Sequence, residues 1–202
     1  MRVLAVVGSQ RMNGNSYLLT KTVLEDVRVD HAIVQLADKN IGFCTLCQKC
    51  IDDDCPLDDD FNGIVKEMEK ADGIIFAVPR YLFFPAKFLC FLERMDNINH
   101  MRQHKGYKRT FANRDYRLFS DEKPFCIFAV SGEGKIQKWA LKTVAEDLEG
   151  LGLKLVRYDE RPYYGISVKG GEEIGEVLGH KEGFAECQRL AEKLVDSIRT
   201  RG

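Results

Sequence analysis

An α/β fold, in which helices cover both faces of a parallel sheet, is the fold class that this sequence predicts. Short apolar runs alternate along the chain with segments that repeat apolar residues at helical spacing, and this alternation is typical of strand–helix–strand units. The run at residues 73–78 is apolar throughout, as expected of a central parallel strand that is buried on both faces. The pattern as a whole predicts a doubly wound sheet of five strands.

The positions of the apolar residues predict each element in turn. Strands are expected at residues 2–7, 31–36, 73–78, 125–130 and 153–158. Helices are expected at residues 15–27, 60–70, 86–95, 135–148 and 181–198. A polar and basic stretch at 97–121 and a glycine-rich stretch at 161–179 interrupt the alternation. We interpret both as insertions on a single domain that spans residues 1–202.

Composition excludes several classes of protein. Apolar residues make up 45% of the 202 residues and charged residues 30%, which is ordinary for a globular protein. The formal net charge of −1 provides no overall field that would attract nucleic acid or an anionic membrane. The sequence contains neither a membrane-spanning apolar run nor a signal-peptide pattern at its N-terminus. We therefore expect a cytoplasmic protein.

The loop after the first strand carries phosphate-binding groups. Residues 8–16 read Gly-Ser-Gln-Arg-Met-Asn-Gly-Asn-Ser, and Ser9, Arg11, Asn15 and Ser16 could all donate to a phosphate at the following helix N-terminus. In doubly wound sheets, ligands bind beyond the carboxyl ends of the strands, and FMN does so in the flavodoxin order. The P-loop and the Gly-x-Gly-x-x-Gly dinucleotide patterns are both absent. A polar turn that merely caps the helix is the alternative.

The second candidate site is a run of cysteines. Cys44, Cys47, Cys50 and Cys55 lie in the spacing Cys-x-x-Cys-x-x-Cys-x4-Cys-Pro, which favours a [4Fe–4S] cluster bound by all four thiolates. Zinc sites more often present two separated Cys-x-x-Cys knuckles, so zinc is the second interpretation and redox-active thiols are the third. The remaining three cysteines are scattered in apolar surroundings, where we expect small buried side chains.

These motifs, in this order, resemble those of the iron–sulfur flavoproteins, a branch of the flavodoxin-like NADPH-dependent FMN reductase superfamily. Residues 8–16 are similar to the flavin phosphate loop of that family, residues 44–55 to its cluster loop, and residues 71–81 to its third strand and flavin-ring loop. The resemblance implies a flavodoxin-like sheet with the strand order 2-1-3-4-5, with the cysteine loop after strand 2 and an insertion after helix 3. It also implies FMN, a [4Fe–4S] cluster and a homo-oligomer, either a dimer or a tetramer.

The resemblance further implies which residues contact the flavin ring. These are Pro79, Arg80, Tyr81, Leu82 and Phe83 after the third strand, and Ser131, Gly132, Glu133 and Gly134 after the fourth. Arg80 stands where an apolar residue is more usual. Its guanidinium is expected either to stabilise the reduced flavin by its charge or to be an ordinary surface arginine.

The function expected from these features is that of a flavin-dependent oxidoreductase that passes electrons between FMN and the cluster. NAD(P)H is the candidate donor, and a ferredoxin or a small-molecule acceptor is the candidate partner. One alternative is an NAD(P)H-dependent FMN or quinone reductase without a cluster. Another is a zinc-stabilised binding module on the same scaffold. The basic segment at 102–117 is expected to be a solvated lid, or to dock on the acidic cysteine loop of a neighbouring subunit or on an acidic ferredoxin.

Overall fold

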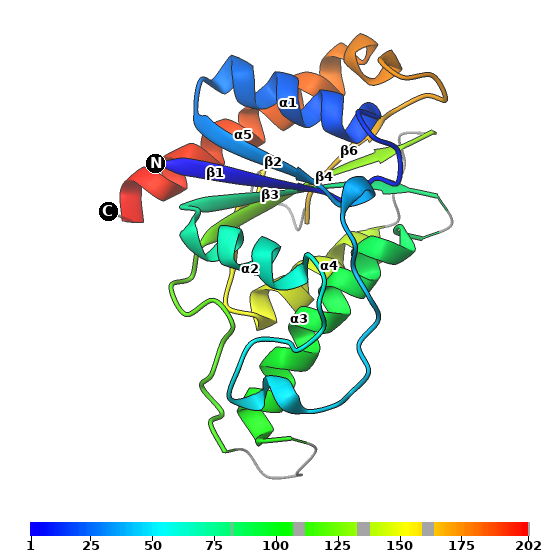
Figure 1. Cartoon of the computed structure of the whole chain (residues 1–202). Coiled ribbons are helices and arrows are strands. Elements are labelled where there is room, and N and C mark those ends of the chain that lie inside the picture. Colours follow the sequence, from blue (N-terminus) through cyan, green and yellow to red (C-terminus); the bar gives the residue numbers. More distant parts are fainter. Residues whose placement is uncertain (82, 107–111, 133–137, 159–163, 202) are drawn as a thin grey trace.

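A twisted parallel sheet with helices on both faces forms the body of the molecule (Figure 1). The computed structural model describes residues 1–81, 83–106, 112–132, 138–158 and 164–201. The strands are β1 (Arg2–Val7), β2 (Asp30–Gln35), β3 (Gly73–Arg80), β4 (Pro124–Ser131), β5 (Lys154–Leu155) and β6 (Ile166–Lys169). Their order is β2-β1-β3-β4-β5, all pairs are parallel, and β6 pairs with β4. The fold is therefore flavodoxin-like, and the predicted strand order is confirmed.

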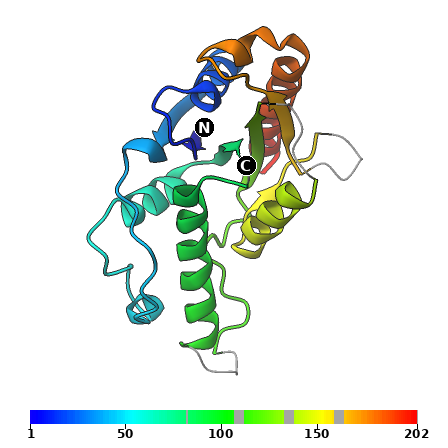
Figure 2. The same cartoon turned by 90° about the vertical axis from the view of Figure 1, so that its right-hand side faces the viewer.

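The helices divide between the two faces of the sheet (Figures 1 and 2). α1 (Asn15–Val27) and α5 (Lys181–Arg201) cover one face, and α2 (Phe61–Lys70), α3 (Ala86–His104) and α4 (Lys138–Gly150) cover the other. Alternate residues of each strand supply the two cores, because successive side chains point to opposite faces. In β1, for example, Val3 and Ala5 pack with α1 and α5, whereas Leu4 and Val6 pack with α2 and α3. None of the described helices is long and apolar enough to cross a membrane.

The fifth strand position differs from the prediction, which placed one strand at 153–158. β5 ends at Leu155, and the remainder of the edge is supplied by β6, which lies inside the predicted glycine-rich insertion at 161–179. β5 pairs with the start of β4 at Pro124 and Phe125, and β6 pairs with its end, from Phe128 to Ser131. Two short strands therefore pair one after the other along the outer edge of β4, because β4 is longer than either of them.

The third helix is also longer than predicted, since it ends at His104 rather than near Met95. Ile98 and Met101 continue its buried side beyond the predicted end. These two residues line a cavity together with the cysteine loop. The first part of the expected insertion at 97–121 is therefore helical, because the cysteine loop supplies a surface against which additional helix can be buried. Residues 135–137 of the fourth predicted helix lie outside the described residues.

The turn after β6 requires glycine. Gly171 has a φ of +68°, and a Cβ at this position would collide with the side chain of Glu176. At Gly170, a Cβ would collide with Val130 of β4. The backbone at 170–171 can therefore pass close to the end of β4 only because it has no side chains there.

We expect Gly171→Ala to destabilise the fold by about 1–2 kcal/mol, because left-handed backbone is costly for any residue with a Cβ. Gly63→Ala is the matched control. Gly63 lies in α2, and a Cβ added there would meet nothing within 4 Å, so this change should stabilise the protein by roughly 0.5–1 kcal/mol. Urea unfolding of both variants measures the difference. Equal effects of the two changes would contradict the role assigned to Gly171.

Candidate functional site

Four loops at the carboxyl ends of β1, β3, β4 and β6 enclose a cavity of about 330 Å³. We call it the loop cavity. It brings together nine residues predicted from the sequence and three that were not. The predicted ones are Ser9, Arg11, Asn15, Ser16, Pro79, Arg80, Tyr81, Ser131 and Gly132, and the others are Val130, Gly171 and Glu172. Leu82, Glu133 and Gly134 lie outside the described residues.

The N-terminus of α1 opens into the loop cavity. Its N-cap residue, Gly14, provides no side-chain cap, so the first backbone N–H groups of the helix are left for a ligand. Two hydroxyl residues flank this end and are buried, Ser9 and Ser16. The exposed Arg11 adds a positive charge at the rim. Together they make an anion-binding end to the cavity.

The opposite wall contains an unused polar atom. Ser131 is buried at the end of β4, and its Oγ has no hydrogen-bond partner within the part of the chain that the structure describes. A buried hydroxyl without a partner costs free energy. Because Ser131 lines the loop cavity, a ligand with polar ring atoms would satisfy it. This observation fits an FMN ring on this side of the cavity.

Asn15 has a different role from the one its position suggests. Its Nδ2 donates to the carbonyl oxygens of Gly170 at 2.5 Å and of Glu173 at 2.9 Å, and its Oδ1 accepts from the backbone N–H of Gly175 at 2.8 Å. The side-chain amide is therefore engaged by the loop at 170–175.

The loop at 170–175 was missed by sequence reasoning. It enters the loop cavity through Gly171 and Glu172, and the Glu172 carbonyl accepts a hydrogen bond from Nη1 of Arg11 at 3.0 Å. The adjacent glycines at 170 and 171 were the available signal, because paired glycines mark a close backbone approach. Without a prediction of β6, nothing in the sequence placed them beside β4.

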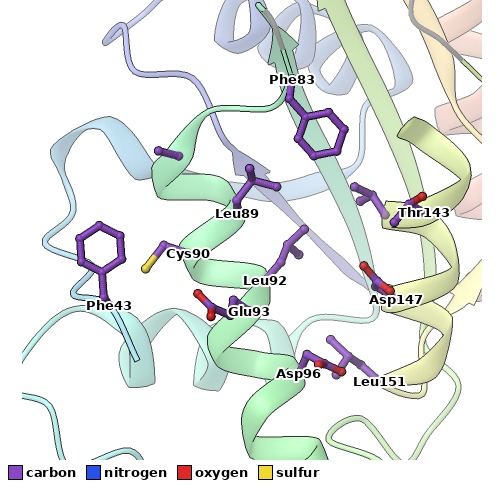
Figure 3. Close-up of a pocket in the computed structure, with 12 residues that line it drawn as sticks. Phe43, Phe83, Leu89, Cys90, Leu92, Glu93, Asp96, Thr143, Asp147 and Leu151 are labelled. Atoms are coloured by element: carbon purple, nitrogen blue, oxygen red, sulfur yellow. The ribbon is translucent and has the colours of Figure 1, made fainter. Parts of the chain in front are cut away.

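Phe83 is not brought into the loop cavity. It lines a separate groove of about 460 Å³ between α3 and α4 (Figure 3), where its ring stacks on Trp139 with centroids 5.5 Å apart. Phe43, which directly precedes the cysteine loop, also lines this space, on the side of α3 that faces away from α4 (Figure 3), and is 77% exposed. Glu93, Asp96 and Asp147 make part of this surface acidic, and like charges would repel an acidic protein there.

All four clustered cysteines line one small cavity, which we call the cysteine cavity. α3 closes it with Arg94, Asn97, Ile98 and Met101. Burial raises the pKa of the Cys50 thiol, and the neighbouring thiols of Cys55, Cys44 and Cys47 add to the increase. Between the cysteines, Leu46 and Gln48 have positive φ values of 52° and 60°. Such strained backbone in residues other than glycine is characteristic of functional loops.

The donor set of the cysteine cavity suits a metal group that is bound by sulfur. Four thiols are soft ligands, which iron–sulfur clusters and zinc sites both use. Among the described residues, no group of three His, Cys, Asp or Glu side chains is arranged to hold one metal ion.

A buried arginine fixes the cysteine loop to α3. Arg94 is only 1% exposed and forms an ion pair with Asp59. Its Nη1 also donates to the Gly42 carbonyl at 3.2 Å, and its Nη2 donates to Sγ of Cys55 at 3.1 Å. Asp59 in turn accepts from the backbone N–H of Gly42 at 2.8 Å and of Phe61 at 3.1 Å. The start of the loop, its last cysteine and α2 are thereby joined at one point.

Arg102, two turns further along α3, also contacts the cysteine loop. Its Nε donates to the Cys50 carbonyl at 3.0 Å and its Nη2 to the Asp53 carbonyl at 2.8 Å. Part of the predicted basic segment therefore docks on the acidic cysteine loop of its own chain. Its Nη1 donates to the hydroxyl of Tyr116 at 2.6 Å, which connects the segment after α3 to the same contact.

The remaining cysteines lie in the core, as expected. Cys90, Cys126 and Cys187 are all buried, and burial raises the pKa of each of these thiols. Cys90 additionally places its Sγ 3.2 Å from the Gly42 carbonyl, to which it donates. None of the three lines the cysteine cavity.

Comparison with protein families and known proteins finds relatives of this chain. The family model for NADPH-dependent FMN reductases matches residues 1–158. The chain is 36% identical over 85 residues to an iron–sulfur flavoprotein of Methanocaldococcus jannaschii, with 40% of this chain and 44% of that protein covered. It is 30% identical over 99 residues to an iron–sulfur flavoprotein of Methanosarcina thermophila, with 46% and 52% covered. The chain thus spans about half the length of these curated relatives.

Among solved structures, the Trp repressor binding protein from Bacillus subtilis is similar in fold. The TM-score is 0.61 at 16% identity, and the alignment covers 93% of this chain and 96% of that one. At this identity, the similarity bears on the arrangement of helices and strands alone. It agrees with the sheet order described above.

The ion pair between Arg94 and Asp59 predicts a pH dependence. Although burial would raise it, the hydrogen bonds from Arg94, Gly42 and Phe61 hold the pKa of the Asp59 carboxyl below its ordinary value. A carboxyl with a lowered folded pKa stabilises the fold above its unfolded pKa of about 3.9, and this contribution is lost as the pH falls through the folded value. We expect Asp59→Asn to lower the free energy of unfolding at pH 7 by about 3 kcal/mol or more.

The difference between Asp59→Asn and the unchanged protein should shrink as the pH falls below about 4, because the unfolded chain takes up a proton there while the native carboxyl, with its lowered pKa, is still ionised. Urea unfolding at several pH values measures it. The exposed neighbour Asp58 provides the control, since Asp58→Asn should be nearly neutral throughout. A difference for Asp59→Asn that is the same at pH 3 and pH 7 would rule out the ion pair as its cause.

Proposed function

The chain belongs to the NADPH-dependent FMN reductase family, whose model matches residues 1–158, and from this membership we propose that it is a flavin-dependent oxidoreductase. FMN occupies the loop cavity, and a [4Fe–4S] cluster occupies the cysteine cavity. FMN accepts electron pairs and the cluster carries single electrons. NAD(P)H is the proposed donor. The observation that carries the proposal is the convergence of four loops, far apart in sequence, on one cavity with an anion-binding end.

Different residues of the loop cavity contact the phosphate and the ring of FMN. The uncapped end of α1 and the hydroxyls of Ser9 and Ser16 bind the phosphate, and Arg11 adds its charge. The Ser131 hydroxyl, unpartnered among the described residues, donates to a polar atom at the ring edge. Arg80 and Tyr81 line the same cavity after β3. Arg80 thereby contributes positive charge on the ring side, which favours the reduced and more negative flavin.

The residues of the cysteine cavity hold and insulate the cluster. Cys44, Cys47, Cys50 and Cys55 are its ligands, and the buried side of α3 excludes water from one side through Ile98 and Met101. This assignment is supported by the names of the relatives, which are iron–sulfur flavoproteins. The cluster-free FMN or quinone reductase would leave four thiols in one cavity without a role. The zinc-stabilised module would leave the loop cavity without one.

Anaerobic reconstitution with iron, sulfide and FMN tests the proposal. We expect about one flavin and four iron atoms per chain, with absorption from both groups and reduction by NAD(P)H. Cys47→Ser should lose the iron but retain the flavin, whereas the core variant Cys187→Ala should retain both. Yellow protein without iron supports the cluster-free reductase, and colourless protein with zinc supports the module. Protein that binds neither FMN nor iron would refute both cofactor assignments.

The part played by Asn15 can be separated from direct phosphate binding. We expect Asn15→Ala to accelerate amide hydrogen exchange at Gly175 in the FMN-free protein by about fivefold, because one hydrogen bond contributes about 1 kcal/mol. FMN affinity should also fall, by roughly tenfold, as the cavity wall loosens. Ser16→Ala should weaken FMN binding and leave exchange at Gly175 unchanged. Weaker FMN binding in Asn15→Ala with unaltered exchange would instead make its side chain a direct ligand.

A further inference from the structure

Arg94 directs one of its two terminal nitrogens to a predicted cluster ligand. Nη1 is occupied by Asp59 and by the Gly42 carbonyl, whereas the one described contact of Nη2 is Sγ of Cys55, at 3.1 Å. The guanidinium also lies 4.0 Å from the centre of the Phe61 ring. These contacts on three sides restrict the Arg94 side chain to one orientation. In that orientation, an N–H group of Nη2 points at Sγ of Cys55.

The surroundings make this contact electrostatically strong. Arg94 is 1% exposed and the Asp59 carboxylate 4%, so water screens neither charge effectively. Nε of Arg94 is buried without a partner within the described residues. Burying this charge costs desolvation free energy. In return, the guanidinium makes hydrogen bonds to Asp59, Gly42 and Cys55 that an apolar side chain could not make. The sulfur of Cys55 is the acceptor in this set that belongs to the candidate redox site.

We propose that Arg94 is a positioning residue that raises the reduction potential of the cluster through its hydrogen bond and charge at Cys55. The inference depends on the cluster of the proposed function. Hydrogen bonds to cluster sulfurs and nearby positive charge both stabilise the reduced form, which carries one more electron. Removal of the guanidinium should therefore lower the potential. A purely structural role for Arg94, as an anchor of the loop through Gly42, would leave the potential unchanged.

Arg102 supplies the matched control. Arg102 lies on the same helix and also contacts the cysteine loop. Its hydrogen bonds to that loop go to the backbone carbonyls of Cys50 and Asp53 and not to a sulfur atom. Loss of Arg102 therefore loosens the cysteine loop without removing a donor from a ligand atom. Arg94→Lys adds a second comparison, because it keeps a positive charge but cannot reproduce the fork that reaches Asp59 and Cys55 together.

The test is a redox titration of the reconstituted protein and of the Arg94→Met, Arg94→Lys and Arg102→Met variants. Dithionite supplies the electrons, and electron paramagnetic resonance follows the reduced cluster. Arg94→Met should shift the reduction equilibrium about tenfold toward the oxidised form, which is ~59 mV for a one-electron couple. Arg94→Lys should shift it in the same direction by a smaller amount, and Arg102→Met should leave it unchanged. The iron–cysteine stretching bands in the resonance Raman spectrum should move only in the two Arg94 variants.

The outcomes are separable from those of the proposed function. If the unaltered chain takes up no iron, the cluster assignment itself is wrong. If it takes up iron and the Arg94 variants that bind a full cluster keep its potential, the role of Arg94 is refuted. A shift of equal size in Arg102→Met would refute it as well, because loop anchoring would then be the cause. Should Arg94→Met fail to fold, the potential of Arg94→Lys decides, and an unchanged value there overturns the inference.

Discussion

The ion pair between Arg94 and Asp59 is the interaction on which the position of the cysteine loop depends. The cysteine loop has little regular structure of its own, apart from a 3₁₀ turn at Lys49–Ile51. Its geometry is set from outside, by a buried guanidinium on α3 and a carboxylate next to the start of α2. Breaking such a pair by removing one partner leaves an uncompensated charge in the core. The loop, α3 and Asp59 next to the start of α2 therefore form one unit.

α3 is the element that relates the two candidate sites to each other. Near its start, Phe88 packs so closely against Gly8 that a Cβ at residue 8 would lie 3.0 Å from the ring, which positions the loop after β1. Further along, Arg94 and Arg102 hold the cysteine loop. A single rigid helix thus carries the supports of both cavities. The distance between the two sites is set by the rise of that helix, and Figure 1 shows how far it extends below the sheet.

The sequence alone predicted those parts whose signal is local. Period and composition identified the strands, and the position after the first strand placed Ser9. The strand order and the assignment of Ser131 followed from the family resemblance. The misses have a common cause, since each depended on contacts with distant residues. α3 continues past Met95 because the cysteine loop covers Ile98 and Met101, and β6 forms because the end of β4 offers an unpaired edge. The engagement of Asn15 by the loop at 170–175 likewise required knowledge of where β6 ends.

The hydrogen bonds between the Asn15 side chain and the loop at 170–175 have a consequence for the order in which the cavity forms during synthesis. One wall of the loop cavity is made by Gly171 and Glu172, which lie beyond the stretch that the family model matches, residues 1–158. A nascent chain that has emerged from the ribosome only as far as β5 contains all of residues 8–16. It does not yet contain Gly170, Glu173 and Gly175, the hydrogen-bond partners of the Asn15 side chain. The wall of the loop cavity at Gly171 and Glu172 therefore cannot form before residues well beyond β5 have been synthesised.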